Sequence, residues 1–358
     1  MPYSRKVPRI FQSGKRQPAG ELDLIRRIRE RASRSGGGEV RLGIGDDCAL
    51  LRPRSGEELA ITTDLSIAGR HFQLAWHPPE AVGHRTLARG LSDLAAMGAL
   101  PVAAFLSLGL PRELAASRKS KARNQSFSSW FDKFLDGFLA LADPTGTPLA
   151  GGDLAESPLF VADIVLIGAV RRGRALLRSG ARPGDLLYVT GTLGGAAAGL
   201  GRLTDWAAQQ PQSQTDRTPR PPRTLESALA PHLYPQPRLA QGQSLAGHKA
   251  ATAALDISDG LSTDLAHLCE ESRVAAEIDA ASLPIYPGAT LEQALHGGED
   301  YELLFTASPA TRVPRSIAGV PVTRIGRIVR KNVRRPQITL LTAQGRQPLE
   351  PKGWEHFA

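Results

Sequence analysis

The sequence has little cysteine, few aromatic residues and no long apolar run. Its 358 residues include two cysteines, Cys48 and Cys269, too few for a disulfide framework or a zinc site built on thiolates. We therefore expect a reducing compartment, the cytoplasm. Aromatic residues make up 5% of the chain, which is low for a protein that stacks single-stranded nucleic acid. No apolar stretch approaches the ~20 residues of a membrane span, and the basic N-terminus lacks the apolar segment of a signal peptide, so we expect no membrane partner.

The chain carries an excess of positive charge that lies mainly at its ends. Lys and Arg number 44 and Asp and Glu number 35, which gives a formal charge of +9. Residues 1–19 hold five of the cations and no acid, and residues 307–349 hold nine and no acid. Basic patches can bind nucleic acid, but a solvated face is the commoner role of such a run. We therefore do not expect nucleic acid as a partner.

Apolar periodicity predicts an α/β (α+β) chain with two domains, because 358 residues exceed one ordinary core. Helical spacing predicts helices over 21–32, 79–97, 130–142, 194–203 and 259–271, and apolar runs predict strands over 43–51, 59–64, 102–108, 160–170, 186–190, 301–306 and 322–329. The predicted organisation is a basic extension at 1–19, an N-terminal domain at 20–172 and a C-terminal domain at 173–358, with insertions near 115–128 and 207–223.

Acidic residues recur in short motifs beside glycines or hydroxyls. Six segments share this pattern: 43–48, 61–64, 91–98, 150–153, 256–261 and 297–304. A single such segment is usually a turn or a helix cap. Six of them, several at the ends of apolar strands, are costly to bury without partners. Mg²⁺ is a suitable partner because it prefers carboxylate, hydroxyl and phosphate oxygens. The pattern therefore predicts a magnesium and phosphate site.

Spacing narrows the candidates within these motifs. Thr62 and Asp64 are two residues apart, so they share one face of a strand. Asp256 and Asp259 are three apart, so one turn can aim both at one ion. Asp93 lies in a helix rich in Ala and Leu, where a buried acid needs a metal or a basic partner.

Common nucleotide-binding motifs are missing. The segment Gly242–Gly247 has the glycine spacing of a Walker A loop, but His248 stands where its lysine must be. The small-residue run 190–199 follows a strand and opens a helix. It fits either a phosphate held on backbone N–H groups or close helix packing.

The motifs together resemble a known family. GIGDDCALL, TTDLSIAGRHF, LSDLAAMGALP, LAGGD, RSGARPGD, LDISDGL and GGEDYELLF are similar, in this order, to those of thiamine-monophosphate kinases, from Gly20 to Phe357. That family belongs to the superfamily of aminoimidazole ribonucleotide synthetase. The resemblance implies two α/β domains, a homodimer formed through the N-terminal sheets, and ATP bound in a cleft. It also implies phosphorylation of thiamine monophosphate to thiamine diphosphate with several Mg²⁺ ions.

The resemblance assigns roles to particular residues. It implies Mg²⁺ ligands at Asp46, Thr62, Thr63, Asp64, Asp93, Asp153, Asp256 and Asp259. It implies ATP contacts at Gly152, Asp153, Arg178 and Ser258, and substrate contacts at His71, Glu299 and Trp354. No covalent nucleophile is expected, because a phosphate monoester is already anionic at neutral pH and metal ions can offset its repulsion from ATP.

Several assignments have alternatives. Without the resemblance, His71 and Arg178 are interpreted as surface residues and Trp354 as an anchor of the C-terminus. Asp300 or Glu302 could take the place of Glu299 as a substrate contact. Adenine contacts are unassigned, with the 130–138 helix as a candidate.

The chain departs from the family pattern at two positions. Arg70 stands where an uncharged residue is usual, and Leu154 where Thr is usual. Arg70 could add a phosphate contact or only a surface charge.

Other functions fit less well. A selenophosphate synthetase would need a cysteine near a glycine-rich N-terminus, and the hydrogenase maturation protein would end in a cysteine tail. A nucleic-acid binder that uses the Arg-rich stretch 312–335 would not need so many acids.

Overall fold

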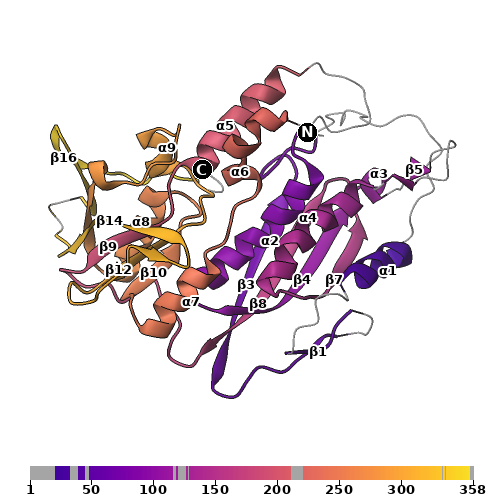
Figure 1. Ribbon diagram of the computed structural model, residues 1–358, viewed down its shortest axis with the longest axis horizontal. Helices are drawn as coiled ribbons and strands as arrows, with labels where there is room; N and C mark the ends of the chain where they lie inside the picture. Colours follow the sequence, from indigo (N-terminus) through magenta and orange to yellow (C-terminus); the bar gives the residue numbers. More distant parts are fainter. Residues whose placement is uncertain are drawn as a thin grey trace, which may run out of the picture.

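Two mixed α/β units lie side by side in a computed structural model of the chain (Figure 1). The structure describes residues 21–32, 39–44, 48–115, 118–119, 126–127, 129–210, 221–332, 334 and 336–354. The predicted metal ligand Asp46 and the basic extension 1–19 lie outside these residues. So do 211–220 of the predicted insertion at 207–223 and most of the one near 115–128.

The first unit is built on a four-stranded sheet of the described chain. Its strand order is β3-β8-β4-β7, antiparallel except for the parallel pair β4 and β7. Its elements are α1 (Glu21–Ala32), β1 (Val40–Leu42), β2 (Leu50–Leu51), β3 (Glu57–Ile67), α2 (Pro79–Ala96), β4 (Leu100–Leu110), α3 (Arg112–Ala115), β5 (Arg118–Lys119), β6 (Ser126–Phe127), α4 (Trp130–Thr145), β7 (Leu149–Glu156) and β8 (Val161–Arg171).

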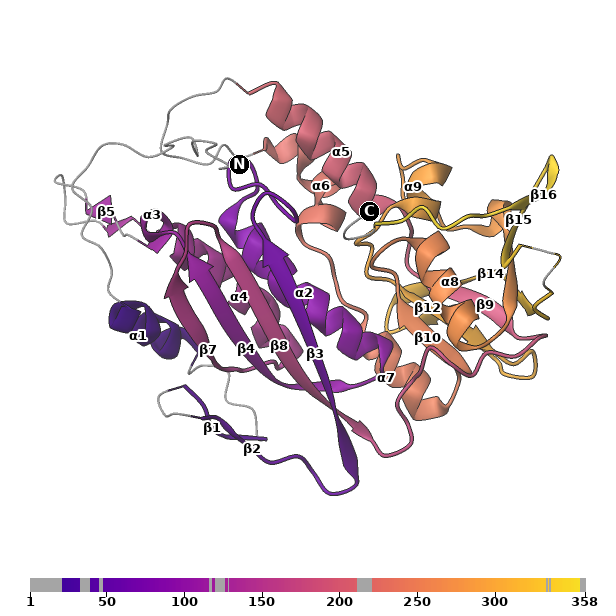
Figure 2. The same cartoon turned by 180° about the vertical axis from the view of Figure 1, so that it is seen from behind.

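Helices α2 and α4 cover one face of this sheet (Figure 2). Pro79 at the first turn favours the start of α2, and a capping box of Ser129 and Asp132 starts α4. The helices approach closely at Gly83. A Cβ atom there would lie 1.9 Å from the carbonyl oxygen of Phe134. Glycine at this position therefore sets the spacing of the two helices.

The described residues cover the other face of the sheet only in part. β1 and β2 pack beside one part of it through Val40 and Leu51. Apolar side chains of β3 stay exposed on the rest: Leu59 is 44% exposed, Ile61 63% and Leu65 44%. We call this surface the open face. None of the helices in the described part of the chain covers it in Figure 2.

The second unit contains a larger mixed sheet. Within the described residues eight strands join it, seven of them in the order β10-β12-β9-β14-β11-β15-β16, with β13 beside β14. Its elements are β9 (Leu186–Thr190), α5 (Gly195–Ala208), η1 (Arg223–Leu225), α6 (Glu226–Leu233), α7 (Leu239–His248), β10 (Ala253–Asp256), α8 (Leu261–Glu271), β11 (Ala275–Asp279), η2 (Ala280–Ser282), α9 (Leu291–His296), β12 (Leu303–Ala307), β13 (Ser316–Ile317), β14 (Val320–Val329), β15 (Ile338–Thr342) and β16 (Gly345–Pro348).

Helix α2 joins the two units. It packs against α7, where a Cβ on Gly242 would lie 1.9 Å from the carbonyl oxygen of Ala95. It also reaches β10, since the Ser92 hydroxyl donates to Asp256 at 2.6 Å. The helix is buried on nearly every side, so its few polar side chains need partners. Those partners lie at the junction of the units.

The predicted elements agree with the structure where apolar spacing is strong. Glu21–Ala32 and Leu186–Thr190 have the predicted bounds, and the mixed class is confirmed. The strand predicted over 43–51 is wrong, because β1 ends at Leu42 and β2 begins at Leu50. Helices α6, α7 and α9 and strands β7, β11, β15 and β16 were not predicted, because they are short or weakly periodic.

Candidate functional site

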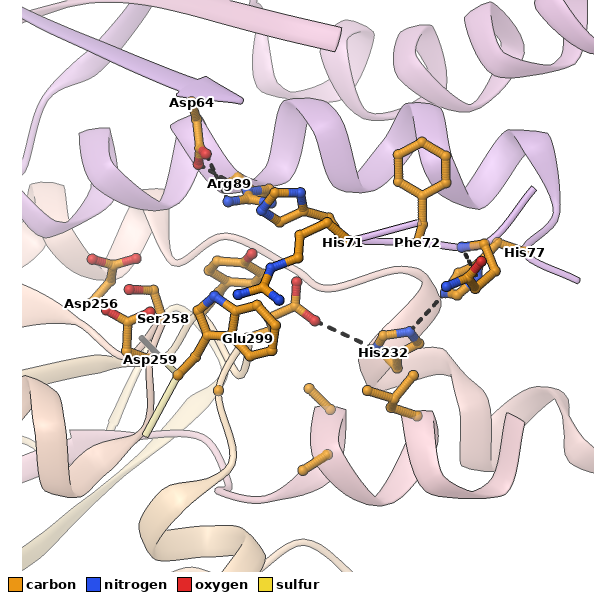
Figure 3. A pocket seen from close by; sticks show the side chains of 18 of the residues that line it. Asp64, His71, Phe72, His77, Arg89, His232, Asp256, Ser258, Asp259 and Glu299 are labelled. Atoms are coloured by element: carbon orange, nitrogen blue, oxygen red, sulfur yellow. Dashed lines mark hydrogen bonds and ion pairs between the residues drawn. The ribbon is translucent and has the colours of Figure 1, made fainter. Parts of the chain in front are cut away.

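A cavity of about 430 Å³ lies between the two units, below α2 and beside α5. Figure 3 shows its lining side chains. Both units contribute to it. The lining residues are Asp64, Arg70, His71, Phe72, Gln73, Trp76, His77, Arg89, Asp93, Ala196, Ala197, Leu200, His232, Asp256, Ser258, Asp259, Gly298, Glu299, Tyr301 and Trp354.

One end of the cavity, the acidic end, gathers four of the predicted aspartates: Asp64, Asp93, Asp256 and Asp259. β3 points Thr62 and Asp64 toward α2, as their spacing predicts. The Thr62 hydroxyl donates to Asp93, and Arg89 donates to Asp64. The end of β10 adds Asp256 and the following turn adds Asp259. Residues far apart in sequence thus form one cluster.

Two aspartates at the acidic end, Asp93 and Asp256, have raised pKa values. Burial, and then the neighbouring charge of Asp256, raise the pKa of the Asp93 carboxyl to about 7. Burial also raises the pKa of Asp256, although the hydrogen bond from Ser92 opposes that rise. The positive charge of Arg178 lowers both values. The ionised carboxylates therefore need more positive charge than the cluster itself contains.

A neighbouring acid, Asp264 on α8, shapes the turn that carries Ser258 and Asp259. One of its carboxylate oxygens accepts the backbone N–H groups of Ser258, Asp259 and Gly260, at 3.1, 3.0 and 3.0 Å. Burial, and the charges of Asp256 and Asp259, raise the pKa of Asp264 to about 8. Asp264 is not among the residues predicted from the sequence, although an acid four residues after Gly260 can accept the N–H groups of the preceding turn.

The donor chemistry of the acidic end fits Mg²⁺, although the carboxylates are not arranged around one point. In the described ranges, no three or more Asp, Glu, His or Cys side chains are at present arranged as the ligands of one metal ion. Asp64, Asp93 and Asp256 are instead each engaged by a protein donor. Clustered carboxylate and hydroxyl oxygens are the ligands that a hard cation prefers. Metal binding would therefore require these side chains to exchange partners.

The middle of the cavity holds Glu299, on a backbone with a φ of 68°. Arg85 of α2 donates to its Oε1 at 2.6 Å. Burial by itself would raise the pKa of Glu299, but the Arg85 guanidinium holds it below its ordinary value. The alternatives Asp300 and Glu302 do not line the cavity.

Asp300 and Glu302 have structural roles. Asp300 accepts the N–H groups of Gly194 and Ala196 at the start of α5, at 2.6 and 3.0 Å. Arg238 binds both oxygens of Glu302. Two backbone donors of the small-residue run at 190–199, at the start of α5, are therefore engaged by a carboxylate of the same chain, which favours the packing interpretation.

The far end of the cavity, the aromatic end, contains Trp76, His77 and His232 (Figure 3). His77 and His232 are buried and their Nε2 atoms lie 3.1 Å apart. Burial, and then the charge of Arg85, lower the pKa of His77 to about 3, so this ring is neutral. The Trp76 ring stacks on His77 with centroids 4.4 Å apart. This end suits a flat heteroaromatic group.

Arg70 and Trp354 also line the cavity, beside Asp259. The Arg70 guanidinium lies 4.4 Å from the centre of the Trp354 ring, and the Trp354 backbone N–H donates to the carbonyl of Asp259. Arg70 is thus more than an isolated surface charge. His71 accepts the backbone N–H of Ile67 at 3.0 Å, which fixes its ring beside the cavity.

Five predicted site residues of the described chain lie outside the cavity lining: Thr62, Thr63, Gly152, Asp153 and Arg178. Thr62 still reaches the acidic end through its hydrogen bond to Asp93. Thr63 is exposed on the open face, opposite Thr62 and Asp64. Asp153 is exposed in β7, three strand spacings or ~14 Å from β3. Arg178 is exposed and acts on the acidic end through its charge.

The 130–138 helix was a candidate for adenine contacts, and for its three fully buried phenylalanines this prediction is wrong. Phe131, Phe134 and Phe138 have 0% exposure and belong to the hydrophobic core. Their helical spacing directs them at the sheet, where a nucleotide has no access.

Comparisons with known proteins agree with the two-unit architecture. The AIR synthase related protein families match residues 45–170 with the N-terminal domain and 182–337 with the C-terminal domain. Thiamine-monophosphate kinase of Escherichia coli strain K12 is 38% identical over 353 residues, which covers 95% of this chain and 98% of the relative. Among the described residues, no helix has the length and apolarity to span a membrane.

Solved structures show the same fold. The crystal structure of thiamine-monophosphate kinase from Stenotrophomonas maltophilia K279a superposes with a TM-score of 0.71 at 38% identity, covering 92% of this chain and 98% of the other. AaThiL in complex with AMPPCP and TMP has a TM-score of 0.68 at 31% identity, with 94% and 97% covered.

Proposed function

Because the chain belongs to the thiamine-monophosphate kinase family, we propose that it transfers the γ-phosphoryl group of ATP to thiamine monophosphate. The products are thiamine diphosphate and ADP. The relative AaThiL binds AMPPCP, an analogue of ATP, together with TMP. Within this chain, one observation carries the proposal: a single cavity has an acidic end and an aromatic end.

The two ends suit the two substrates. The acidic end fits a metal-bound polyphosphate, because carboxylates alone would repel ATP. Glu299 in the middle of the cavity and Trp354 beside Asp259 fit a cationic heteroaromatic ring, through charge and cation–π attraction. We propose His71, Glu299 and Trp354 as substrate contacts, and Gly152, Asp153, Arg178 and Ser258 as ATP contacts.

The reaction needs no covalent intermediate. A phosphate oxygen of thiamine monophosphate attacks the γ-phosphorus of ATP. The bond from that phosphorus to the β,γ-bridging oxygen breaks, and ADP leaves with the electron pair. The attacking phosphate is already anionic at neutral pH, so no strong base is required. The protein has to align the two phosphates and offset their charge.

Mg²⁺ supplies the charge that opposes this repulsion when it is bound. We propose Asp64, Asp93, Asp256 and Asp259, with Thr62, as its ligands around the cavity. Asp46, Thr63 and Asp153 stay proposed ligands. Two of these, Thr63 and Asp153, lie away from the cavity of their own chain, so their contribution would depend on a second copy.

We further propose a homodimer formed through the open face and a cytoplasmic location. Leu59, Ile61 and Leu65 form an exposed apolar stripe along β3, which is typical of a protein contact. The two unpaired cysteines, exposed Cys48 and buried Cys269, fit a reducing compartment.

A product assay tests the proposed reaction. The purified protein with ATP, Mg²⁺ and thiamine monophosphate should yield thiamine diphosphate and ADP in equal amounts, measured by chromatography. Absence of thiamine diphosphate would contradict the proposal. Formation of thiamine diphosphate from free thiamine would reassign the protein as a pyrophosphokinase.

A further inference from the structure

One face of α2 carries three charged side chains, Arg85, Arg89 and Asp93, of which Arg89 and Asp93 line the cavity. They are four residues apart, so they lie above one another on the same side of the helix. Arg85 binds Glu299, and Asp93 belongs to the acidic end. Arg89 therefore lies between them, where two phosphates bound from opposite ends would meet.

Arg89 is largely but not fully buried, and one carboxylate holds it. Its side chain is 15% exposed. Its Nε donates to Asp64 Oδ2 at 3.0 Å, and its Nη2 lies 2.8 Å from Asp64 Oδ1. Among the described residues none forms a hydrogen bond with its Nη1. Figure 3 shows the pair at the edge of the cavity. The guanidinium thus occupies both oxygens of a proposed metal ligand.

Building on the proposed function, we propose that Arg89 is a catalytic residue that leaves Asp64 and binds the phosphoryl group in transfer. Both oxygens of Asp64 are used by Arg89, so Mg²⁺ and the guanidinium compete for this carboxylate. Once Asp64 ligates the metal, Arg89 is a buried cation in need of an anion. The nearest anion that the reaction supplies is the transferred phosphoryl group.

An arginine suits this task. Charge in the transition state spreads over the equatorial phosphoryl oxygens, and the planar guanidinium can donate to two oxygens at once. A lysine at the same place would supply the positive charge but not the paired, planar N–H donors of an arginine. Asp64 thus keeps a catalytic cation positioned until metal binding releases it.

Turnover of Arg89→Gln provides the first test. The variant should lose ~10²–10³-fold in kcat, the effect typical of removing one transition-state donor. The KM for each substrate should change much less. Arg89→Lys should keep the fold and recover part of the loss. Wild-type kcat in Arg89→Gln would overturn the proposal.

Metal binding provides a second readout that does not depend on turnover. Titration of Mg²⁺ into the protein, followed by calorimetry without nucleotide, should give a severalfold lower Kd for Arg89→Gln than for wild type, because Asp64 is released. A purely structural role of Arg89 predicts weaker or unchanged Mg²⁺ binding and a lower melting temperature. Weaker or unchanged Mg²⁺ binding by Arg89→Gln would overturn the proposed exchange of Asp64 between Arg89 and Mg²⁺.

Arg112→Gln is a matched control. Arg112 also uses Nε and Nη2 on one carboxylate, Glu156, but both partners are more than 60% exposed and lie outside the cavity lining. Its kcat and Mg²⁺ affinity should equal those of wild type. Failure of the proposed function would appear separately, as a wild-type protein that makes no thiamine diphosphate but still binds Mg²⁺ in competition with Arg89.

Discussion

At the scale of the residue, burial decides how much the loss of an ion pair costs in stability. Arg85 and Glu299 form a pair whose side chains are 6% and 27% exposed, while Arg112 and Glu156 are 64% and 61% exposed. The chemistry of the two pairs is the same. Removing one partner of a buried pair leaves the other charge unpaired and shielded from water. Removing one partner of an exposed pair leaves the other charge in water.

Glu299→Gln should therefore destabilise the protein by about 3 kcal/mol and raise the KM for thiamine monophosphate. Arg85 holds the pKa of Glu299 below its ordinary value of 4.5, so the pair stabilises the fold above that pH and its contribution is lost as the pH falls through the lower folded value. The difference between wild type and variant in urea unfolding should shrink in acid.

Glu156→Gln is the control for this prediction. It should change the free energy of unfolding by less than about 1 kcal/mol and leave the KM unchanged. Equal effects of the two substitutions would show that burial of the Arg85–Glu299 pair is unimportant.

At the scale of the element, α2 positions most of the site. It supplies Arg89 and Asp93 to the cavity, Arg85 to Glu299 and Ser92 to Asp256. Its placement depends on close packing with α4 and α7, which glycines permit. A small shift of this helix would therefore move several functional groups together.

Gly83→Ala tests this packing. The new Cβ would lie 1.9 Å from the Phe134 carbonyl oxygen, so α2 and α4 must separate. We expect a loss of about 2–3 kcal/mol in the free energy of unfolding and a lower kcat. Gly201→Ala in α5 is the matched control, because nothing lies within 4 Å of its Cβ position. It should stabilise the protein by up to ~1 kcal/mol. Similar values for both variants would contradict close packing at Gly83.

At the scale of the whole molecule, the open face of the first sheet needs a covering. Ile61 is 63% exposed in the middle of the stripe formed by β3. A charged side chain there would be desolvated in the proposed dimer.

Ile61→Lys should convert the homodimer into a monomer, as measured by light scattering coupled to size exclusion. Leu291→Lys is the control, because Leu291 is 38% exposed at the start of α9 in the other unit. It should leave the mass unchanged. A wild-type protein that is already monomeric would contradict the proposed dimer.

The sequence by itself determined the class of the fold, the long helices and strands, and the family, because apolar periodicity and short motifs are local properties. It also predicted that Thr62 and Asp64 share a face, since strand geometry fixes that relation. It left Glu299, Asp300 and Glu302 equivalent.

Only the tertiary structure separated those three acids, placing Glu299 in the cavity and the other two in structural roles. It likewise placed Arg89 against Asp64 and left Thr63 and Asp153 outside the cavity. The physical reason is that burial, and pairing between residues far apart in sequence, depend on how α2 packs between the two units. No local pattern encodes that arrangement.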